Sequence, residues 1–201
     1  MSELKIALCL SGKIGNTKGK SGNHKSEARV LTKGFEHYKK HVLEQNNVDV
    51  FIHCWDLELQ ELTNSLYKPV KAIFEKQKIF DIPKHVSGDY NRRQSHYSRW
   101  YSNFCVNKLR EEHEEINSFK YDLVMTTRFD LAFETDVRFD SLDEEYFYAG
   151  NWSAVLDKGG RDLFKGGRGP LYDLVKRDPR VTESLSYALK GYPHSNDGFL
   201  D

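Results

Sequence analysis

The residues best placed to do chemistry are Arg128 and Asp130, which directly follow a predicted strand over residues 121–127. Residues two positions apart in an extended chain point the same way, so this guanidinium and carboxylate can face one ligand together. A carboxylate there can hold Mg²⁺ or Mn²⁺ against a diphosphate, because both cations prefer oxygen ligands. An arginine can also bind a diphosphate directly through its planar fork of donors. The alternative is an ion pair of Arg128 with Asp130 at the surface, which would only end the strand.

Polar residues also lie at the ends of the other predicted strands. They are Ser11, Gly12, Lys13, His53, Trp55, Asp56 and Glu75. In an open α/β sheet, ligands bind beyond the carboxyl ends of the strands, so we expect these groups to converge. Gly12 lets a ligand approach its backbone amide because no side chain intervenes. Trp55 either stacks on a base or belongs to the core, and His53 is either a ligand contact or a structural histidine.

The elements that must position these groups alternate strands with helices. We expect strands at 4–10, 48–53, 70–74 and 121–127, and helices at 30–45, 57–66, 94–117 and near 171–176. In the first helix, Leu31, Phe35, Tyr38 and Val42 fall on one face at spacings of four, three and four residues. This order predicts an α/β fold with a Rossmann-like, mostly parallel sheet and helices on both faces.

The third predicted helix opens with a mixture of cations and hydroxyls between Arg92 and Arg99. A helix N-terminus favours an anion, so Tyr97 and Ser98 are candidates to contact a diphosphate or a sugar. The alternative is a solvated first turn in which Tyr97 enters the core.

Four segments of the chain together carry a family resemblance. They are KIALCLSG (5–12), DVFIHCW (49–55), RRQSHYSRWYS (92–102) and YDLVMTTRFDL (121–131). They resemble small glycosyltransferases of the GT-A type, which occur in bacterial and phage surface-polysaccharide loci. The resemblance implies transfer of a sugar from a nucleotide-diphosphate sugar donor to a glycan acceptor in polysaccharide biosynthesis. It also implies that the ends of the first two strands surround the nucleotide.

The chain departs from this family at the metal motif. GT-A enzymes carry an Asp-x-Asp motif whose last acid binds Mn²⁺ or Mg²⁺ between the two phosphates of the donor. The corresponding triplet here is Arg128–Phe129–Asp130, so the resemblance implies a metal role for Asp130 alone. The arginine in place of the first acid can partly replace the cation.

The second half of the chain must supply the acceptor site. An inverting sugar transfer needs a base that takes the proton of the acceptor hydroxyl, and Asp197 is the candidate. We therefore expect a single glycosyltransferase-like domain over 1–201, with a nucleotide-sugar-binding half over 1–131 and an acceptor half over 132–201. Because the chain stops within an apolar segment, we expect a C-terminal truncation.

Two other functions stay open on the sequence. Lys20 and Ser21 end a basic loop that is similar to a phosphate-binding loop, which would indicate a P-loop-like nucleotide phosphotransferase. That motif needs four residues between its glycines, whereas three separate Gly15 from Gly19. The loop is otherwise expected to close over a bound nucleotide. The second alternative is a non-catalytic module that binds a nucleotide or a glycan.

The composition limits the partners and the compartment. The 201 residues include 30 Lys and Arg against 30 Asp and Glu, and a neutral chain argues against a nucleic-acid binder. No apolar run approaches the roughly 18 residues that cross a bilayer, so we expect no transmembrane segment. The 3 cysteines lie far apart, which suits a reducing compartment. We expect a cytoplasmic protein.

Overall fold

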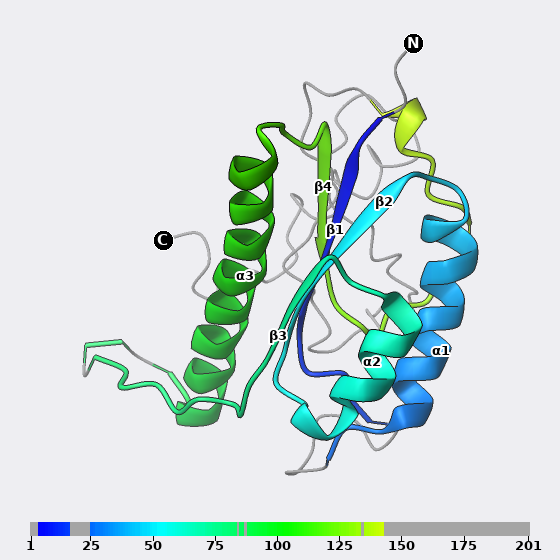
Figure 1. The fold of residues 1–201 in the computed structure, drawn as a ribbon. Coiled ribbons are helices and arrows are strands. Elements are labelled where there is room, and N and C mark those ends of the chain that lie inside the picture. Colours follow the sequence, from blue (N-terminus) through cyan, green and yellow to red (C-terminus); the bar gives the residue numbers. More distant parts are fainter. Residues whose placement is uncertain (1–3, 17–24, 84, 87, 134, 143–201) are drawn as a thin grey trace, which may run out of the picture. The chain divides into compact units, whose positions relative to one another are not determined.

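Four parallel strands form one sheet in the computed structural model, which describes residues 4–16, 25–83, 85–86, 88–133 and 135–142. The strands are β1 (Ile6–Gly12), β2 (Val48–Cys54), β3 (Lys71–Phe74) and β4 (Leu123–Thr127). Their order across the sheet is β3-β2-β1-β4 (Figure 1). The predicted α/β fold with a parallel sheet is thereby confirmed, and the helix expected near 171–176 lies outside the described residues.

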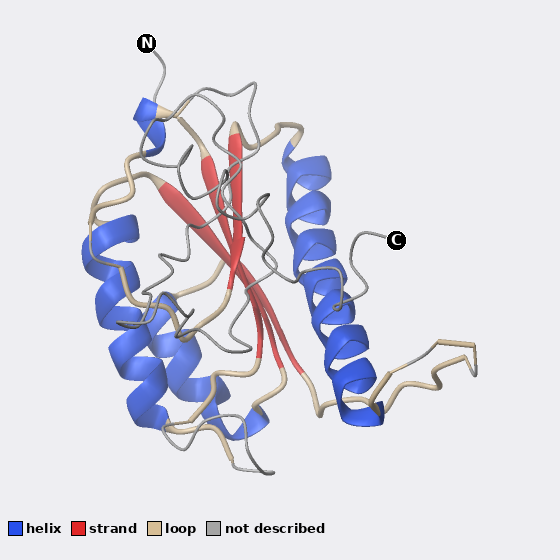
Figure 2. Cartoon of the chain, turned by 180° about the vertical axis from the view of Figure 1, so that it is seen from behind, coloured by secondary structure: helices blue, strands red, loops and turns tan. Residues whose placement is uncertain are grey.

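Helices cover both faces of this sheet, as the sequence predicts. They are α1 (Ala28–Tyr38), which continues as a π-helical turn (Lys39–Leu43), then α2 (Gln60–Tyr67) after a 3₁₀ turn (Leu57–Leu59), and α3 (Tyr90–Asn117). In both views, α1 and α2 lie on one face of the sheet and α3 lies on the other (Figures 1 and 2).

The start of α3 differs from the predicted boundary. The helix begins at Tyr90, within a segment that the sequence predicts to be a loop, rather than at Gln94. The Asp89 side chain accepts a hydrogen bond of 2.9 Å from the Arg92 amide. This is the N-cap contact that satisfies a free amide of the first turn, and it explains the earlier start.

β1 is buried on both faces, which accounts for its continuous apolar sequence. Alternate residues of a strand point to opposite faces of the sheet. On one face, β1 packs with Leu31, Tyr38 and Val42. On the other, it packs with Val106 and Leu109 of α3. The core therefore lies in two layers, one on each side of β1.

The chain reverses its direction across the sheet between β1 and β4. From β1 it moves outward to β2 and β3 by way of α1 and α2, and α3 then carries it over the opposite face to β4 on the other side of β1. In open α/β sheets, the crevice that binds ligands lies at such a switch point, beyond the carboxyl ends of the strands. The ends of β1 and β4 are therefore the place to search for a site.

The last described segment packs back onto the end of the first helix. The Val137 amide donates to the His41 carbonyl at 2.8 Å, and His41 Nδ1 lies 2.7 Å from Asp136 Oδ1. The Phe139 ring is buried, and its amide donates to Asn46 Oδ1 at 3.1 Å. Residues 135–142, which the sequence assigns to the acceptor half, thus belong to the same compact unit as the sheet.

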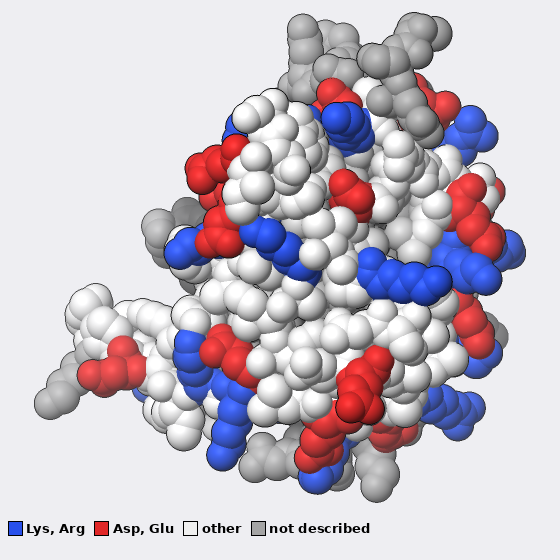
Figure 3. All heavy atoms as spheres, viewed as in Figure 1, with Lys and Arg blue, Asp and Glu red and all other residues white. Residues whose placement is uncertain are grey.

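The described surface carries both signs of charge. On the face shown in Figure 3, basic and acidic side chains are interspersed over the described residues. No helix of the described part is long and apolar enough to cross a membrane.

Candidate functional site

Arg128 and Asp130 form a bidentate ion pair at the end of β4. Arg128 donates from Nε to Asp130 Oδ1 at 2.7 Å and from Nη2 to Oδ2 at 2.6 Å. The two side chains are 45% and 27% exposed, so the pair reaches solvent. A guanidinium has five N–H donors, and this pair uses two of them. The other edge of Arg128 has no acceptor among the described residues and can therefore receive an anion.

A second arginine lies within electrostatic range of Arg128. Arg99 is half-buried on α3 and makes no ion pair within the described part of the chain. Burial lowers the pKa of Arg99, and the positive charge of Arg128 lowers it further. Arg99 and Arg128 therefore repel each other, and Asp130 is the only acid that pairs with either of them among the described residues.

The backbone at Arg128 is held in place by packing and hydrogen bonds from the core. The Phe129 ring is fully buried in the core. The Tyr38 hydroxyl lies 2.9 Å from Thr127 Oγ1 and donates to the Arg128 carbonyl. A Cβ at Gly34 would lie 2.0 Å from the Phe129 carbonyl oxygen, so only a glycine lets α1 approach this closely. The position of Arg128 is therefore set by the core.

The loop after β1 lies beside the ion pair, and Asp56 holds this loop in place. Asp56 Oδ2 accepts hydrogen bonds from the Ile14 amide at 2.8 Å and the Ser26 hydroxyl at 2.7 Å. Ser26 Oγ in turn accepts from the Gly15 amide at 3.1 Å. A Cβ at Gly15 would lie 3.4 Å from Asp130 Oδ2, so this loop lies directly against the ion pair. Asp56 therefore positions the loop.

The same hydrogen bonds bear on the phosphate-binding-loop alternative. In such a loop, backbone amides point at the phosphates. The amides of Ile14 and Gly15 are instead directed to protein oxygens. Lys20 and Ser21, the other residues of that alternative, lie outside the described residues.

Gly12 and Lys13 lie where β1 ends and this loop begins. Gly12 has a φ of +103°, and nothing lies within 4 Å of where its Cβ would be. The Lys13 side chain is exposed. Ser11 is buried and donates to Asn103 Oδ1 of α3 at 3.2 Å, so it ties the strand to the helix.

The remaining candidates gather under the end of β2 instead. His53 is fully buried, and Trp55 is 5% exposed with its ring stacked 5.6 Å from that of Tyr101. Ser98 is buried and accepts from Gln77 Nε2 at 3.1 Å, whereas the Tyr97 ring lies 6.0 Å from that of Phe80. Of the two alternatives for Trp55, the core position is the one observed.

The described residues around Asp130 do not fit a divalent cation. Both of its carboxylate oxygens are bonded to Arg128. Among the described residues, Asp130 belongs to no cluster of three or more His, Cys, Asp or Glu side chains. A cation at Asp130 would have to displace the guanidinium, and a hard cation such as Mg²⁺ also prefers several oxygen ligands. The described residues alone therefore offer no prepared site for the cation that the resemblance implies at Asp130.

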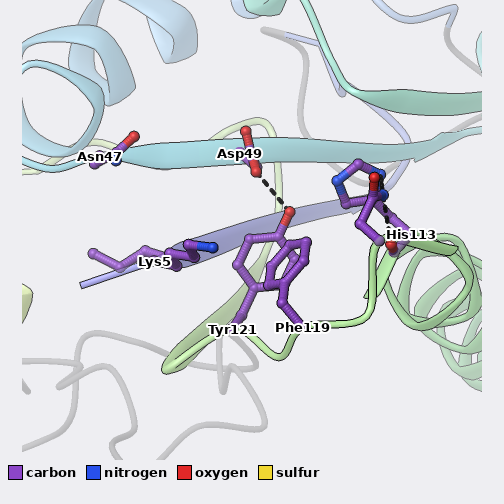
Figure 4. Close-up of a pocket in the computed structure, with 8 residues that line it drawn as sticks. Lys5, Asn47, Asp49, His113, Phe119 and Tyr121 are labelled. Atoms are coloured by element: carbon purple, nitrogen blue, oxygen red, sulfur yellow. Dashed lines mark hydrogen bonds between the residues drawn. The ribbon is translucent and has the colours of Figure 1, made fainter. Parts of the chain in front are cut away.

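Two hollows lie away from the switch point. One of about 390 Å³ is at the beginnings of β1 and β2, where Asp49 accepts from the Tyr121 hydroxyl at 2.7 Å beside Lys5 and His113 (Figure 4). The other, of about 590 Å³, is lined by residues 79–82 with Tyr90 and Arg93. The first hollow lies where the strands begin, at the edge of the sheet opposite their carboxyl ends.

The structure thus brings together Arg128, Asp130 and the loop that Asp56 holds. It also links Arg99, which ends the cation-bearing stretch at the predicted helix start, electrostatically to Arg128. The signal for Arg99 is its place one turn before Asn103 on a helix that covers the sheet. Asp197 lies outside the described residues. No family model matches this chain, and no curated protein or solved structure matches it either.

Proposed function

We propose that the protein is a glycosyltransferase that binds the diphosphate of a nucleotide-sugar donor between Arg128 and Arg99. The observation that carries this proposal is the bidentate Arg128–Asp130 pair at the β1–β4 switch point, with Arg99 within electrostatic range of Arg128. Like charges repel at short range, and Arg99 has no carboxylate partner in the described part of the chain. A bound diphosphate would neutralise both cations.

The chemistry that these residues support is stabilisation of a leaving group. The bond between the anomeric carbon and the phosphate oxygen breaks, and the acceptor oxygen forms the new bond to that carbon. Negative charge grows on the departing nucleoside diphosphate, where donors fixed in advance stabilise it most. Arg128 is fixed by Asp130 and by the Tyr38 contact to its backbone, so it meets this requirement.

Two parts of the reaction rest on other residues. The donor's base or ribose can approach the backbone at Gly12, where no side chain intervenes. The acceptor hydroxyl must give its proton to a base, for which Asp197 remains the candidate. The two arginines supply the positive charge that faces the diphosphate.

A thermal-shift screen tests the proposal. The full chain is heated with UDP, GDP, CMP and dTDP sugars and with ATP, each with Mn²⁺ and with EDTA. We expect stabilisation by one nucleotide sugar that persists in EDTA, and transfer of its sugar to a hydroxyl acceptor. Stabilisation by ATP alone would favour the phosphotransferase, and binding without turnover on any acceptor would favour the non-catalytic module.

Variants then locate the donor. Arg128→Gln removes charge-assisted contacts worth about 1.5–3 kcal/mol, so donor affinity should fall about tenfold to a hundredfold. The matched control is Arg138→Gln, because Arg138 also precedes an acid by two positions and pairs with Asp140 at 3.1 Å on the surface. Equal losses in both variants would contradict the assigned site.

A further inference from the structure

A histidine, a carboxylate and a thiol meet at the end of β3, away from Arg128. His53 ends β2, Glu75 follows β3, and Cys105 lies on α3, the helix beside these strands (Figure 1). One ligand atom from each of the three lies within 4.8 Å of the other two. The closest pair is His53 Nε2 and Glu75 Oε1, at 3.0 Å.

The second nitrogen of His53 is held in the manner of a metal ligand. Nδ1 lies 2.7 Å from the buried Ser102 hydroxyl. Histidines that bind metals direct their other ring nitrogen to such a partner, which fixes the ring and the tautomer. Ser102 Oγ is also 3.4 Å from the His53 carbonyl, to which it can donate while it accepts from Nδ1. In the metal-free protein Nε2 carries the ring proton and donates it to Glu75. When an ion binds, the ring proton shifts to Nδ1, which donates to Ser102, and the Nε2 lone pair is left for the ion.

We infer that His53, Glu75 and Cys105 bind a Zn²⁺ ion. Nitrogen, carboxylate and thiolate are the ligand types that zinc takes, whereas Mg²⁺ and Ca²⁺ avoid sulfur. Zinc–ligand bonds of about 2.0–2.3 Å place tetrahedral ligands about 3.3–3.8 Å apart, so small side-chain rotations close the site. The Cys105 thiol releases its proton to solvent on binding. Three protein ligands leave a fourth position for water.

Access to the site is from the side of Glu75. The His53 side chain is fully buried, whereas Glu75 is 27% exposed and Cys105 is half-buried. The ion would therefore enter from solvent and join β2, β3 and α3 at one point.

Lys78 is the residue that competes with the ion. Its Nζ lies 3.2 Å from Glu75 Oε2 and 4.1 Å from the centre of the Tyr101 ring. A cation in that place neutralises the carboxylate that zinc needs. Because the Lys78 side chain is 44% exposed, it can turn into solvent when the metal binds.

Titration of the full chain with Co²⁺, which reports thiolate ligation by a charge-transfer absorption, tests the site. We expect saturation at one equivalent and displacement by Zn²⁺. Cys105→Ser should abolish the absorption, and the control Cys54→Ala should keep it, because Cys54 packs into the core on the face of the sheet opposite α3. Ser102→Ala should weaken binding about tenfold or more, the usual effect of removing an outer partner.

Lys78→Gln provides a test that misfolding cannot imitate. Removing the competing cation should tighten Co²⁺ binding, whereas the control Lys76→Gln, at an exposed neighbouring position, should leave it unchanged. A wild type without the thiolate absorption would overturn the inference. So would a Cys105→Ser variant that binds Co²⁺ as well as the wild type, or a Lys78→Gln variant that binds it no more tightly.

Discussion

Asp130 holds the Arg128 guanidinium by both of its oxygens in this structure. Both of its oxygens accept from the guanidinium, at 2.7 and 2.6 Å. The two side chains do point the same way, as their spacing predicts. The sequence could not show that they point at each other, because this depends on the rotamers that the packed strand end leaves to them.

The Asp130→Asn variant distinguishes a residue that orients Arg128 from a residue that binds a metal ion. An amide cannot hold the guanidinium by two charged contacts, so Arg128 should lose its fixed orientation and donor affinity should fall about tenfold. The loss should be the same with Mn²⁺ and with EDTA in an isothermal titration. The matched control is Asp140→Asn, whose arginine lies at the same spacing on the surface. If the wild type bound the donor only in the presence of Mn²⁺, Asp130 would instead be a metal ligand.

Gly34→Ala tests how closely the first helix must approach the site. Alanine normally stabilises a helix relative to glycine, by about 1 kcal/mol. Here the added Cβ would lie 2.0 Å from the Phe129 carbonyl oxygen, so the backbone must shift. We expect a loss of about 1–3 kcal/mol in the free energy of unfolding by urea. Lys33→Ala, exposed on the same helix, should be near neutral, and a Gly34→Ala variant more stable than the wild type would contradict the contact.

At the scale of elements, α3 is joined to the start of β4 by a buried acid. Glu114 is 2% exposed and accepts from Arg110 at 2.7 Å, Lys120 at 2.8 Å and the Tyr121 amide at 3.2 Å. Burial alone would raise the pKa of Glu114, but the hydrogen bonds from Lys120, Tyr121 and Arg110 outweigh it and lower the pKa. This junction sets where β4, and with it Arg128, begins.

The contacts of Glu114 make the free energy of unfolding depend on pH. Because the pKa of Glu114 is lower in the folded than in the unfolded chain, its contribution is complete above the ordinary value of 4.5 and is lost as the pH falls through the folded-state pKa. Glu114→Gln should lower the free energy of unfolding by about 1–3 kcal/mol at neutral pH, and the difference should shrink below pH 4.5. Urea unfolding along a pH series measures it. A difference that persists unchanged in acid, or that the exposed Glu115→Gln reproduces, would contradict this account.

Element types were predictable because each carries its own periodicity, and boundaries were not. β1 is a continuous apolar run because α3 and α1 bury both its faces, and such a run is visible in the sequence. It extends to Gly12 because that residue pairs in register with Cys54 of β2, which is a tertiary fact. The start of α3 depends likewise on the Asp89 cap rather than on apolar spacing.

At the scale of the molecule, the sequence predicts that the strand ends share an edge but not which ends are neighbours. β4 lies beside β1 because α3 crosses the opposite face, and this places Arg128 against the loop after β1. His53 and Trp55, which the sequence groups with the same site, instead contact each other at the end of β2, with ring centres 4.7 Å apart. The interaction between Arg99 and Arg128 could be found only once α3 was placed over the sheet, since the two residues lie on different elements.

We expect Arg99 to strengthen donor binding and to lower the free energy of unfolding of the unit that the sheet and helices form. The unliganded protein keeps a partly buried cation within electrostatic range of another, and burial and repulsion both lower the pKa of Arg99. Arg99→Gln removes the charge, so it should raise the free energy of unfolding by about 0.5–2 kcal/mol, as substitutions at strained functional positions do. The same variant should bind the donor about tenfold more weakly, because one cation no longer meets the diphosphate. Urea unfolding without ligand and a donor titration measure the two effects on one preparation. Arg138→Gln should change neither, since that arginine is paired and exposed. A variant at Arg99 that is less stable and binds the donor normally would show that the arginine serves the fold and not the ligand.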